Sequence, residues 1–405
     1  MAAFCAGCAG AQNIQTLLIL RFFAGAFGSS PLTNAGGIVS DMFTSQQRGL
    51  PLLLFAATPY IGPAVAPMIG GFLSMNAGWR WVEGLFAAAS GLVWLTVSFT
   101  VPETYAPVLL RKRAYKLSQI TGHHYRSNLD IGREGETLAK RLRTVFSRPW
   151  VLLFTEPIVL LLTFYAALIY GTLYMLFAAF PIVYQKERGW NPGVAGLPFL
   201  GVLVGMLSAI IYTIWDNNKR YINCQSKYKN GIAPPEARLP PCMLSALTIP
   251  IGLFWFAWTN SPSIHWMAGI AALVPFGFGL VIVYMGIVNY LVDAYTIYAA
   301  SVLASMSVVR YMFGGVFPLF TGYMYRGLGI HWASSIPAFV AVGCIPLPFV
   351  FYVYGERIRK KCKYAAVSAK EVEMLSGGGN GNSNVHVEEE NVQEGGNERK
   401  VKASV

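Results

Sequence analysis

The chain has 405 residues, of which 54% are hydrophobic and 12% are charged, and its formal net charge is +12. A soluble domain carries about a quarter of charged residues, so this composition excludes an ordinary soluble protein. Apolar segments of about 20 residues recur along most of the chain, and each is long enough to cross a bilayer as a helix. The strands of a membrane β-barrel would be shorter and would alternate in polarity. We therefore predict an all-α polytopic membrane protein.

The apolar segments divide the chain into a series of predicted spans. In chain order these are 14–38, 50–73, 79–101, 153–176, 191–215, 242–259, 266–291, 298–322 and 331–354. Residues 1–10 have the composition of the end of another span but are too short to cross alone. They also lack the basic region that begins a signal peptide.

Lysine and arginine gather in three connecting segments, 102–149, 216–241 and 357–363. The positive-inside rule places these segments in the cytoplasm, so the positive charge orients the spans and does not indicate nucleic-acid binding. Six spans lie between the first and the last of these segments, but only three full spans precede the first. This parity predicts a transporter of six plus six spans that lacks its first two spans and part of its third.

Four regions follow from this division. We expect residues 1–103 to form a partial N-terminal helical half, made of a stub and three spans, and residues 104–149 to form a central cytoplasmic loop. Residues 150–363 would form a six-helix C-terminal half. Residues 364–405 are rich in glycine, asparagine and charge, so they cannot bury enough surface to fold and should be a disordered cytoplasmic tail.

The predicted span 50–73 is unusual because it contains three prolines and several glycines. The prolines are Pro59, Pro63 and Pro67, and the glycines include Gly62, Gly70 and Gly71. A proline inside a helix costs about 3 kcal/mol, and in a bilayer the freed backbone groups must find partners within the protein. Glycines let helices approach closely. We predict a bent helix at a seam between two halves, which seals a central cavity; the alternative is a kinked span in a static bundle.

Several short motifs occur together along the chain: LLILRFFAGAFGSSPLTNAGG, SDMFTSQQRG, GPAVAPMIGGFL, GWRW, VPETYAPVLLRKRA, NYLVDAY, YAAS and GGVFPLF. In this combination the chain resembles the major facilitator superfamily, and more narrowly its fungal twelve-span drug:proton antiporters, which include polyamine exporters. The resemblance covers roughly residues 3–365. It implies the major facilitator fold, here lacking about the first two and a half transmembrane helices.

The resemblance also implies roles for individual residues. The RxxxG signature of the family's fourth span is matched by Arg21 and Gly25. The glycine-proline antiporter signature of its fifth span is matched by Gly62, Pro63, Pro67, Gly70 and Gly71. Ala66 departs mildly from this signature, because the family usually has glycine there.

Ionisable side chains at membrane depth cost at least about 2.5 kcal/mol each and are candidates for function. Arg21 could hold a nearby carboxylate in its ionised form and couple proton release to transport, although no partner can be named and snorkelling to the interface is the alternative. Arg310 lies in the middle of a span and should face the bundle or a cavity, or else form a structural ion pair. Asp293 is expected in the short turn after the predicted span 266–291, which is the tenth in the family's numbering. We interpret it as a capping residue that helps to hold the inner gate closed. We assign these residues, with the two signatures, to proton coupling and gating.

Two further acids have a structural interpretation. Glu156 lies at the start of the predicted span 153–176, which is the seventh in the family's numbering, and there the helix dipole favours an acid. Glu83 is expected at the outer membrane interface, paired with Arg80.

Tyrosine and asparagine side chains offer a surface for substrate. In the twelve-span numbering of the family, the family geometry implies that the first, fourth, seventh and tenth spans line the cavity. Tyrosine faces can hold a cationic amine and asparagine can hydrogen-bond it, although ring packing is the alternative explanation. The candidate substrate-binding residues are Asn34, Tyr165, Tyr170, Tyr174, Tyr284 and Asn289.

The sequence contains no HExxH, P-loop or GxSxG motif, so we predict neither an enzyme nor a cofactor. An ion gradient would have to supply the energy, and the resemblance implies protons. We predict a monomeric secondary transporter that exports drug-like or polyamine compounds, amphipathic or cationic, by alternating access. The plasma membrane is the expected location, with the vacuolar membrane as the alternative. The rival functions are a uniporter or symporter, and an inactive or receptor-like membrane remnant.

Overall fold

The computed structural model describes residues 1–30, 38–39, 42, 49–123, 125, 138–227 and 233–368. The main helices of the N-terminal part are α1 (Ala2–Ala9), α2 (Ile14–Gly28), α4 (Gly49–Ala77) and α5 (Trp79–Thr100). Two helices follow in the central region, α6 (Ala106–Thr121) and α8 (Leu138–Thr155). The C-terminal part contains α9 (Pro157–Phe180), α10 (Phe199–Asp216), α12 (Pro240–Thr259), α13 (Trp266–Ala294), α14 (Ala299–Cys344) and α15 (Pro346–Lys361).

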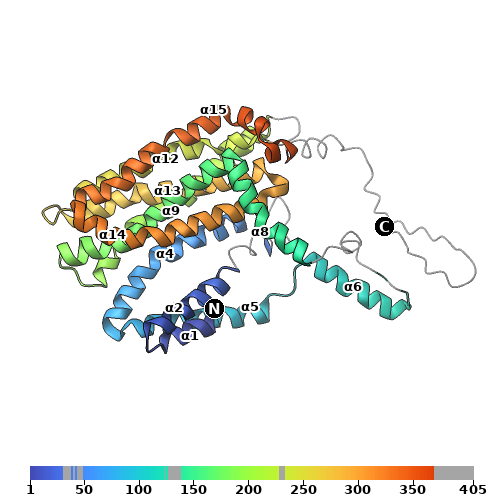
Figure 1. Ribbon diagram of the computed structural model, residues 1–405, viewed down its shortest axis with the longest axis horizontal. Coiled ribbons are helices and arrows are strands. Elements are labelled where there is room, and N and C mark those ends of the chain that lie inside the picture. Colours follow the sequence, from blue (N-terminus) through green and yellow to red (C-terminus); the bar gives the residue numbers. More distant parts are fainter. Residues whose placement is uncertain are drawn as a thin grey trace, which may run out of the picture.

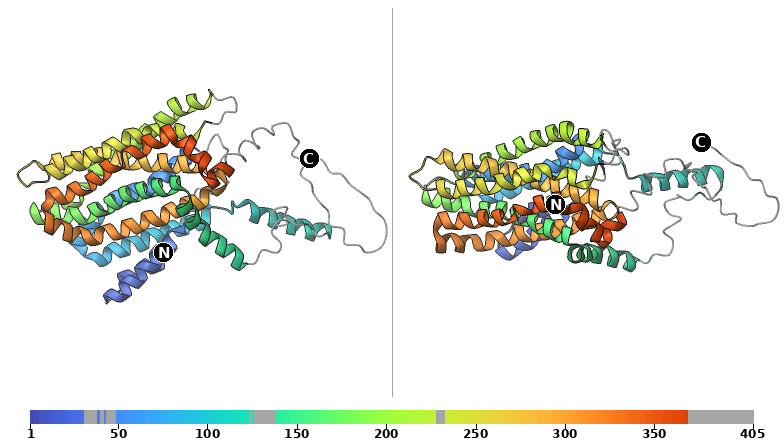
Figure 2. Two further views of the ribbon diagram at one scale, coloured as in Figure 1. Left: turned by 45° about the horizontal axis from the view of Figure 1, so that its top comes forward. Right: turned by 90° about the horizontal axis from the view of Figure 1, so that it is seen from above.

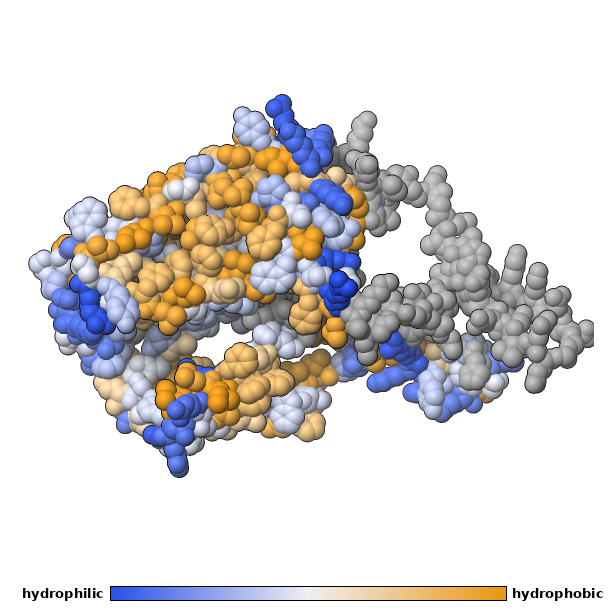
Figure 3. All heavy atoms as spheres, viewed as in Figure 1, coloured by the Kyte–Doolittle hydropathy of each residue, from blue (hydrophilic) through white to orange (hydrophobic). Residues whose placement is uncertain are grey.

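Within the part of the chain that the structure describes, six helical stretches are long and apolar enough to cross a membrane. The last of them, Thr296–Lys361, contains two predicted spans, because α14 is broken at Gly329, whose φ of 73° is not helical. Apolar side chains cover the visible sides of the bundle, whereas hydrophilic ones gather at its ends (Figure 3). These features agree with the predicted all-α membrane protein.

The C-terminal helices form a bundle in which α9 packs on α14, and α13 packs on both α10 and α12 (Figure 1). Helix α4 lies along this bundle and contacts α10, and it also contacts α5, while α1 packs on α2 and α5. The central helices α6 and α8 and the end of α15 lie at the same end of the molecule in every view (Figure 2). The described parts of two of the three basic segments, 102–149 and 357–363, therefore lie at the same end of the molecule.

The predicted span boundaries differ from the structure where proline and glycine interrupt an apolar segment. Helix α10 begins at Phe199, eight residues after the expected start at 191, because Pro192, Gly193 and Pro198 hold the preceding chain in turns. Helix α4, in contrast, continues through its three internal prolines. The predicted tail, 364–405, lies mostly outside the described residues.

Candidate functional site

A buried arginine lies at the centre of the C-terminal bundle. Arg310 of α14 is only 4% exposed. Its guanidinium carbon lies 4.8 Å from the ring centroid of Tyr170 on α9, 4.5 Å from that of Tyr284 on α13 and 4.9 Å from that of Tyr311. One guanidinium nitrogen also donates a hydrogen bond to the Tyr311 hydroxyl at 3.1 Å. These distances are within the range of cation–π attraction, so three helices meet around one cation.

The tyrosines of α9 divide into two groups. The rings of Tyr170 and Tyr174 lie 4.8 Å apart, and their hydroxyls are hydrogen-bonded at 3.1 Å. Tyr165 is buried in the core of the bundle and is not part of this pair. Its separation of five residues from Tyr170 is about 1.4 helical turns, which places it on another face of α9. The structure therefore separates three residues that the sequence grouped together.

Of the two predicted asparagine ligands, the structure describes only Asn289. Asn289 of α13 is half-buried, and its side chain makes no hydrogen bond to the described residues. Asn34 lies outside the described residues.

A pocket adjoins the arginine cluster. It is a small recess between α9 and α13, lined by Ala166, Ile169, Tyr170, Leu280, Val283 and Tyr284. Two of these lining residues, Tyr170 and Tyr284, are the same rings that lie against Arg310. The pocket is therefore apolar on most sides and close to a fixed positive charge.

The position of Tyr170 depends on a glycine of the facing helix. A Cβ atom placed on Gly314 would lie 2.9 Å from Cε1 of Tyr170, closer than real Cβ contacts allow. The neighbouring Gly315 has open space around its Cβ position. Only a residue without a side chain at Gly314 lets the tyrosine ring pack against α14.

Helix α4 meets the C-terminal bundle through close backbone contacts. A Cβ atom on Gly71 would lie 2.6 Å from the carbonyl oxygen of Pro192, and one on Gly196 would lie 2.7 Å from that of Pro67. Ala64 is 1% exposed and belongs to the same buried core as the C-terminal helices. The chain between α9 and α10 thus lies directly on α4.

The other signature residues are less enclosed. Cβ positions on Gly25 and Gly62 meet no described atom within 4 Å, and the nearest such atom to Gly70 is a methyl carbon of Val82 at 3.9 Å. Pro63 is half-buried. Close approach in α4 is therefore a property of Gly71 and not of all three glycines.

Arg21 forms an ion pair with Glu83, which joins α2 to α5. The predicted pairing of Glu83 with Arg80 is wrong, because Arg80 donates to the carbonyl of Ala11 and its guanidinium lies 4.5 Å from the ring of Trp79. The Glu83 side chain is 7% exposed, whereas that of Arg21 is 60% exposed. A buried carboxylate is thus held by a more accessible arginine.

Asp293 is not in a turn, as predicted, but in the last turn of α13. The C-terminus of a helix disfavours an acid, so a compensating cation is expected. Arg238 supplies it at 3.0 Å, and the guanidinium of Arg238 lies 3.5 Å from the ring of Tyr221. This pair ties the connection between α10 and α12 to the end of α13.

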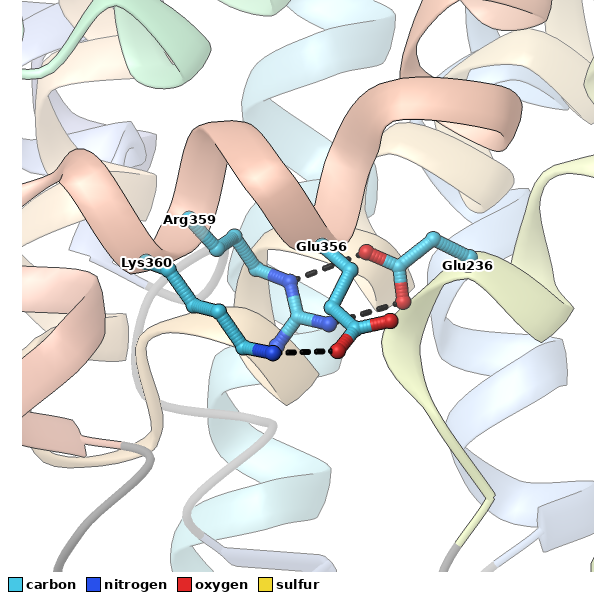
Figure 4. A network of polar contacts seen from close by, with 4 residues as sticks. All are labelled: Glu236, Glu356, Arg359 and Lys360. Atoms are coloured by element: carbon cyan, nitrogen blue, oxygen red, sulfur yellow. Dashed lines mark hydrogen bonds and ion pairs between the residues drawn. The ribbon is translucent and has the colours of Figure 1, made fainter.

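A second ion pair ties the same connection to α15 (Figure 4). Two guanidinium nitrogens of Arg359 donate to the two carboxylate oxygens of Glu236 at 2.9 and 2.8 Å. Both side chains are at most 15% exposed. Next to it, Lys360 pairs with Glu356 at 2.6 Å, but these side chains are 75% and 68% exposed. Neither Glu236 nor its partner was singled out from the sequence, because the two residues are 123 positions apart.

This contrast predicts unequal effects of two neighbouring substitutions. Arg359→Ala should destabilise the protein by about 3–5 kcal/mol, because it leaves the Glu236 carboxylate mostly buried without its cation. Lys360→Ala should have little effect, since solvent screens an exposed pair. Thermal unfolding of the purified protein measures both. Equal shifts in the unfolding temperature would contradict this prediction.

Glu156 lies fully buried at the start of α9. Its carboxylate makes no capping bond to α9 and instead accepts hydrogen bonds from the Tyr295 hydroxyl at 2.8 Å and from the backbone nitrogen of Tyr364 at 2.9 Å. Burial, together with this carboxylate, raises the pKa of the Cys362 thiol to about 12, so the thiol remains protonated. The acid thus joins α9 to the segments that follow α13 and α15, a role beyond the expected helix-dipole interaction.

The family model of the Major Facilitator Superfamily matches residues 1–318. The chain is 64% identical over 368 residues to the Major facilitator superfamily multidrug transporter mdrA of Aspergillus fumigatus, covering 91% of this chain and 60% of that protein. It is 58% identical over 365 residues to the MFS-type efflux pump MFS2 of Trichophyton rubrum, covering 90% and 61%.

The chain is also 50% identical over 373 residues to the Efflux pump FUBT of Fusarium oxysporum, covering 92% of this chain and 63% of that pump. All three relatives are named as transporters or efflux pumps, not as enzymes. The chain spans about three fifths of their length. With its apolar helices and the family match over most of its residues, the chain belongs to the major facilitator superfamily.

Proposed function

We propose that this protein exports drug-like compounds from the cytosol by alternating access, in exchange for protons. The observation that carries the proposal is the contact of α4 with the C-terminal bundle, where the Pro192 carbonyl lies against Gly71. A contact between backbones leaves no room for substrate or solvent, so it closes one end of a pathway while it is formed. The names of the relatives, multidrug transporter and efflux pump, support the direction of transport.

For proton coupling we propose the ion pair of Arg21 and Glu83. A nearby cation favours the ionised carboxylate, and protonation of Glu83 would remove that attraction and release α2 from α5. We place the protein in the plasma membrane as a monomer. The pair is accessible from the Arg21 side, which is the more exposed partner.

Transport in membrane vesicles tests the proposal. In inside-out vesicles that contain the intact protein, a proton gradient, acidic inside, should drive dye uptake, and collapsing the gradient with an uncoupler should stop it. Glu83→Gln should leave dye exchange at equal concentrations but remove its dependence on the gradient. Uptake that continues unchanged after the gradient has collapsed would instead indicate a uniporter.

A further inference from the structure

Helix α8 meets the bundle with only one of its ends. Near its C-terminus, Leu152 and Leu153 belong to the buried core, and there α8 contacts α9 and α14. Glu156 then has an extended backbone, with φ of −108° and ψ of 104°, so α8 and α9 run in different directions. The rest of α8 leaves the bundle at the end where α15 finishes (Figures 1 and 2). Because α9 is long and apolar enough to cross a membrane, its start holds α8 near the membrane surface.

The part of α8 that leaves the bundle carries an exposed apolar strip. The strip consists of Leu142, Val145, Phe146 and Trp150, whose side chains are 43–70% exposed. Steps of three and four residues put the first three on one side of the helix, and Trp150 adjoins them. A helix at a membrane interface buries such a strip at the boundary between headgroups and acyl chains.

Positive charge flanks this apolar strip. At 3.6 residues per turn, Arg143 lies on one side of the strip and Arg148 on the other. Both arginines are exposed, although the guanidinium of Arg148 also lies 5.7 Å from the ring of Tyr298. The sequence of α8 contains four basic residues and no acidic one. An arginine can lay its stem along apolar surface while its guanidinium reaches an anionic headgroup, so charge and hydropathy both fit an anionic membrane surface.

We propose that α8 docks on the cytoplasmic surface of the membrane and binds anionic lipid headgroups there. Leu142, Val145 and Phe146 enter the boundary between headgroups and acyl chains, and Arg143 and Arg148 lie at the level of the headgroups. This inference goes beyond export and does not depend on it, because it concerns the lipid around the carrier and not the substrate.

Hydrogen exchange of the purified intact protein in lipid nanodiscs tests this docking, because the amides of an uncovered helix exchange when it opens locally. Nanodiscs of phosphatidylcholine alone are compared with nanodiscs that contain about 30% phosphatidylserine, an anionic lipid. Exchange of residues 142–150 should be at least about fivefold slower in the anionic nanodiscs. Roughly 1 M salt, at which the Debye length is about 3 Å, should remove the difference.

Three substitutions assign the protection to α8. Arg143→Gln should reduce the protection in anionic nanodiscs, and adding Arg148→Gln should remove most of it. Phe146→Ser should also reduce it, and this ring is 70% exposed, so the substitution spares the core. Lys360→Gln is the matched control, because it removes one exposed positive charge at the same end of the molecule but on α15. It should keep the protection of α8, and thermal unfolding verifies that each variant is folded.

The outcomes are distinct. Equal exchange of residues 142–150 in the two kinds of nanodisc overturns the inference. Slow exchange in both kinds, unaffected by salt, also overturns it, because another part of the protein would then cover the strip. An equal loss of protection in Arg143→Gln and Lys360→Gln would attribute the effect to net charge and would overturn the role of α8. The direction of transport is tested separately in vesicles, so its failure would leave this inference standing.

Discussion

Replacing Gly71 with leucine should abolish export, whereas the same replacement at Gly70 should leave most of it. A Cβ atom on Gly71 would lie 2.6 Å from the Pro192 carbonyl oxygen, so a leucine there forces α4 away from the chain between α9 and α10. At Gly70 the nearest described atom is 3.9 Å away, an ordinary van der Waals distance. Dye efflux from cells, normalised to the amount of protein in the membrane fraction, measures both variants.

A graded series makes this result sharper. Gly71→Ala already places a methyl group too close to the carbonyl and should reduce efflux, although less than leucine does. Both leucine variants add the same volume and hydrophobicity, so a difference between them reports position and not composition. Equal efflux by Gly71→Leu and Gly70→Leu, at equal membrane levels, would refute the contact of α4 with the bundle as a gate.

Removing the carboxylate of Glu156 should also have a large effect, a loss of stability of about 2–5 kcal/mol. The Tyr295 hydroxyl and the Tyr364 amide would both lose their acceptor. A buried donor left without a partner costs about 1–3 kcal/mol. Thermal unfolding of purified Glu156→Ala measures the change.

Two comparisons identify the cause of that effect. Glu156→Gln keeps a carbonyl oxygen and should cost less than Glu156→Ala. Glu187→Ala removes an exposed acid at the opposite end of the same helical stretch and should leave stability unchanged. If Tyr295→Phe and Glu156→Ala were both as stable as the wild-type protein, the hydrogen bonds of Glu156 would be structurally unimportant.

The sequence predicted those features that depend on local composition. Helices α5 and α12 begin and end close to the expected residues, because in both the helix ends where the apolar segment ends. The start of α10 was misplaced because hydropathy continues through Pro192 and Pro198, where the helix does not. Composition alone does not say where an apolar segment stops being helical.

The candidate site was less predictable because its contacts join distant helices. The partner of Glu83 was sought three residues away, at Arg80, but it is Arg21 on another helix. The tyrosines of α9 were identified as candidates, yet no pattern within α9 indicates that Tyr170 faces Arg310, 140 positions later in the chain. Such pairs depend on the rotation of each helix about its axis, which packing determines.

If the protein exports compounds as proposed, Gly314 is a position from which the range of those compounds can change without direct contact. This glycine does not line the pocket, but the ring of Tyr170, which does, rests against it. A single added methyl group would shift that ring and, with it, both the shape of the cavity and the surroundings of Arg310. Adaptation to a new toxin could thus begin at a position that the toxin never touches.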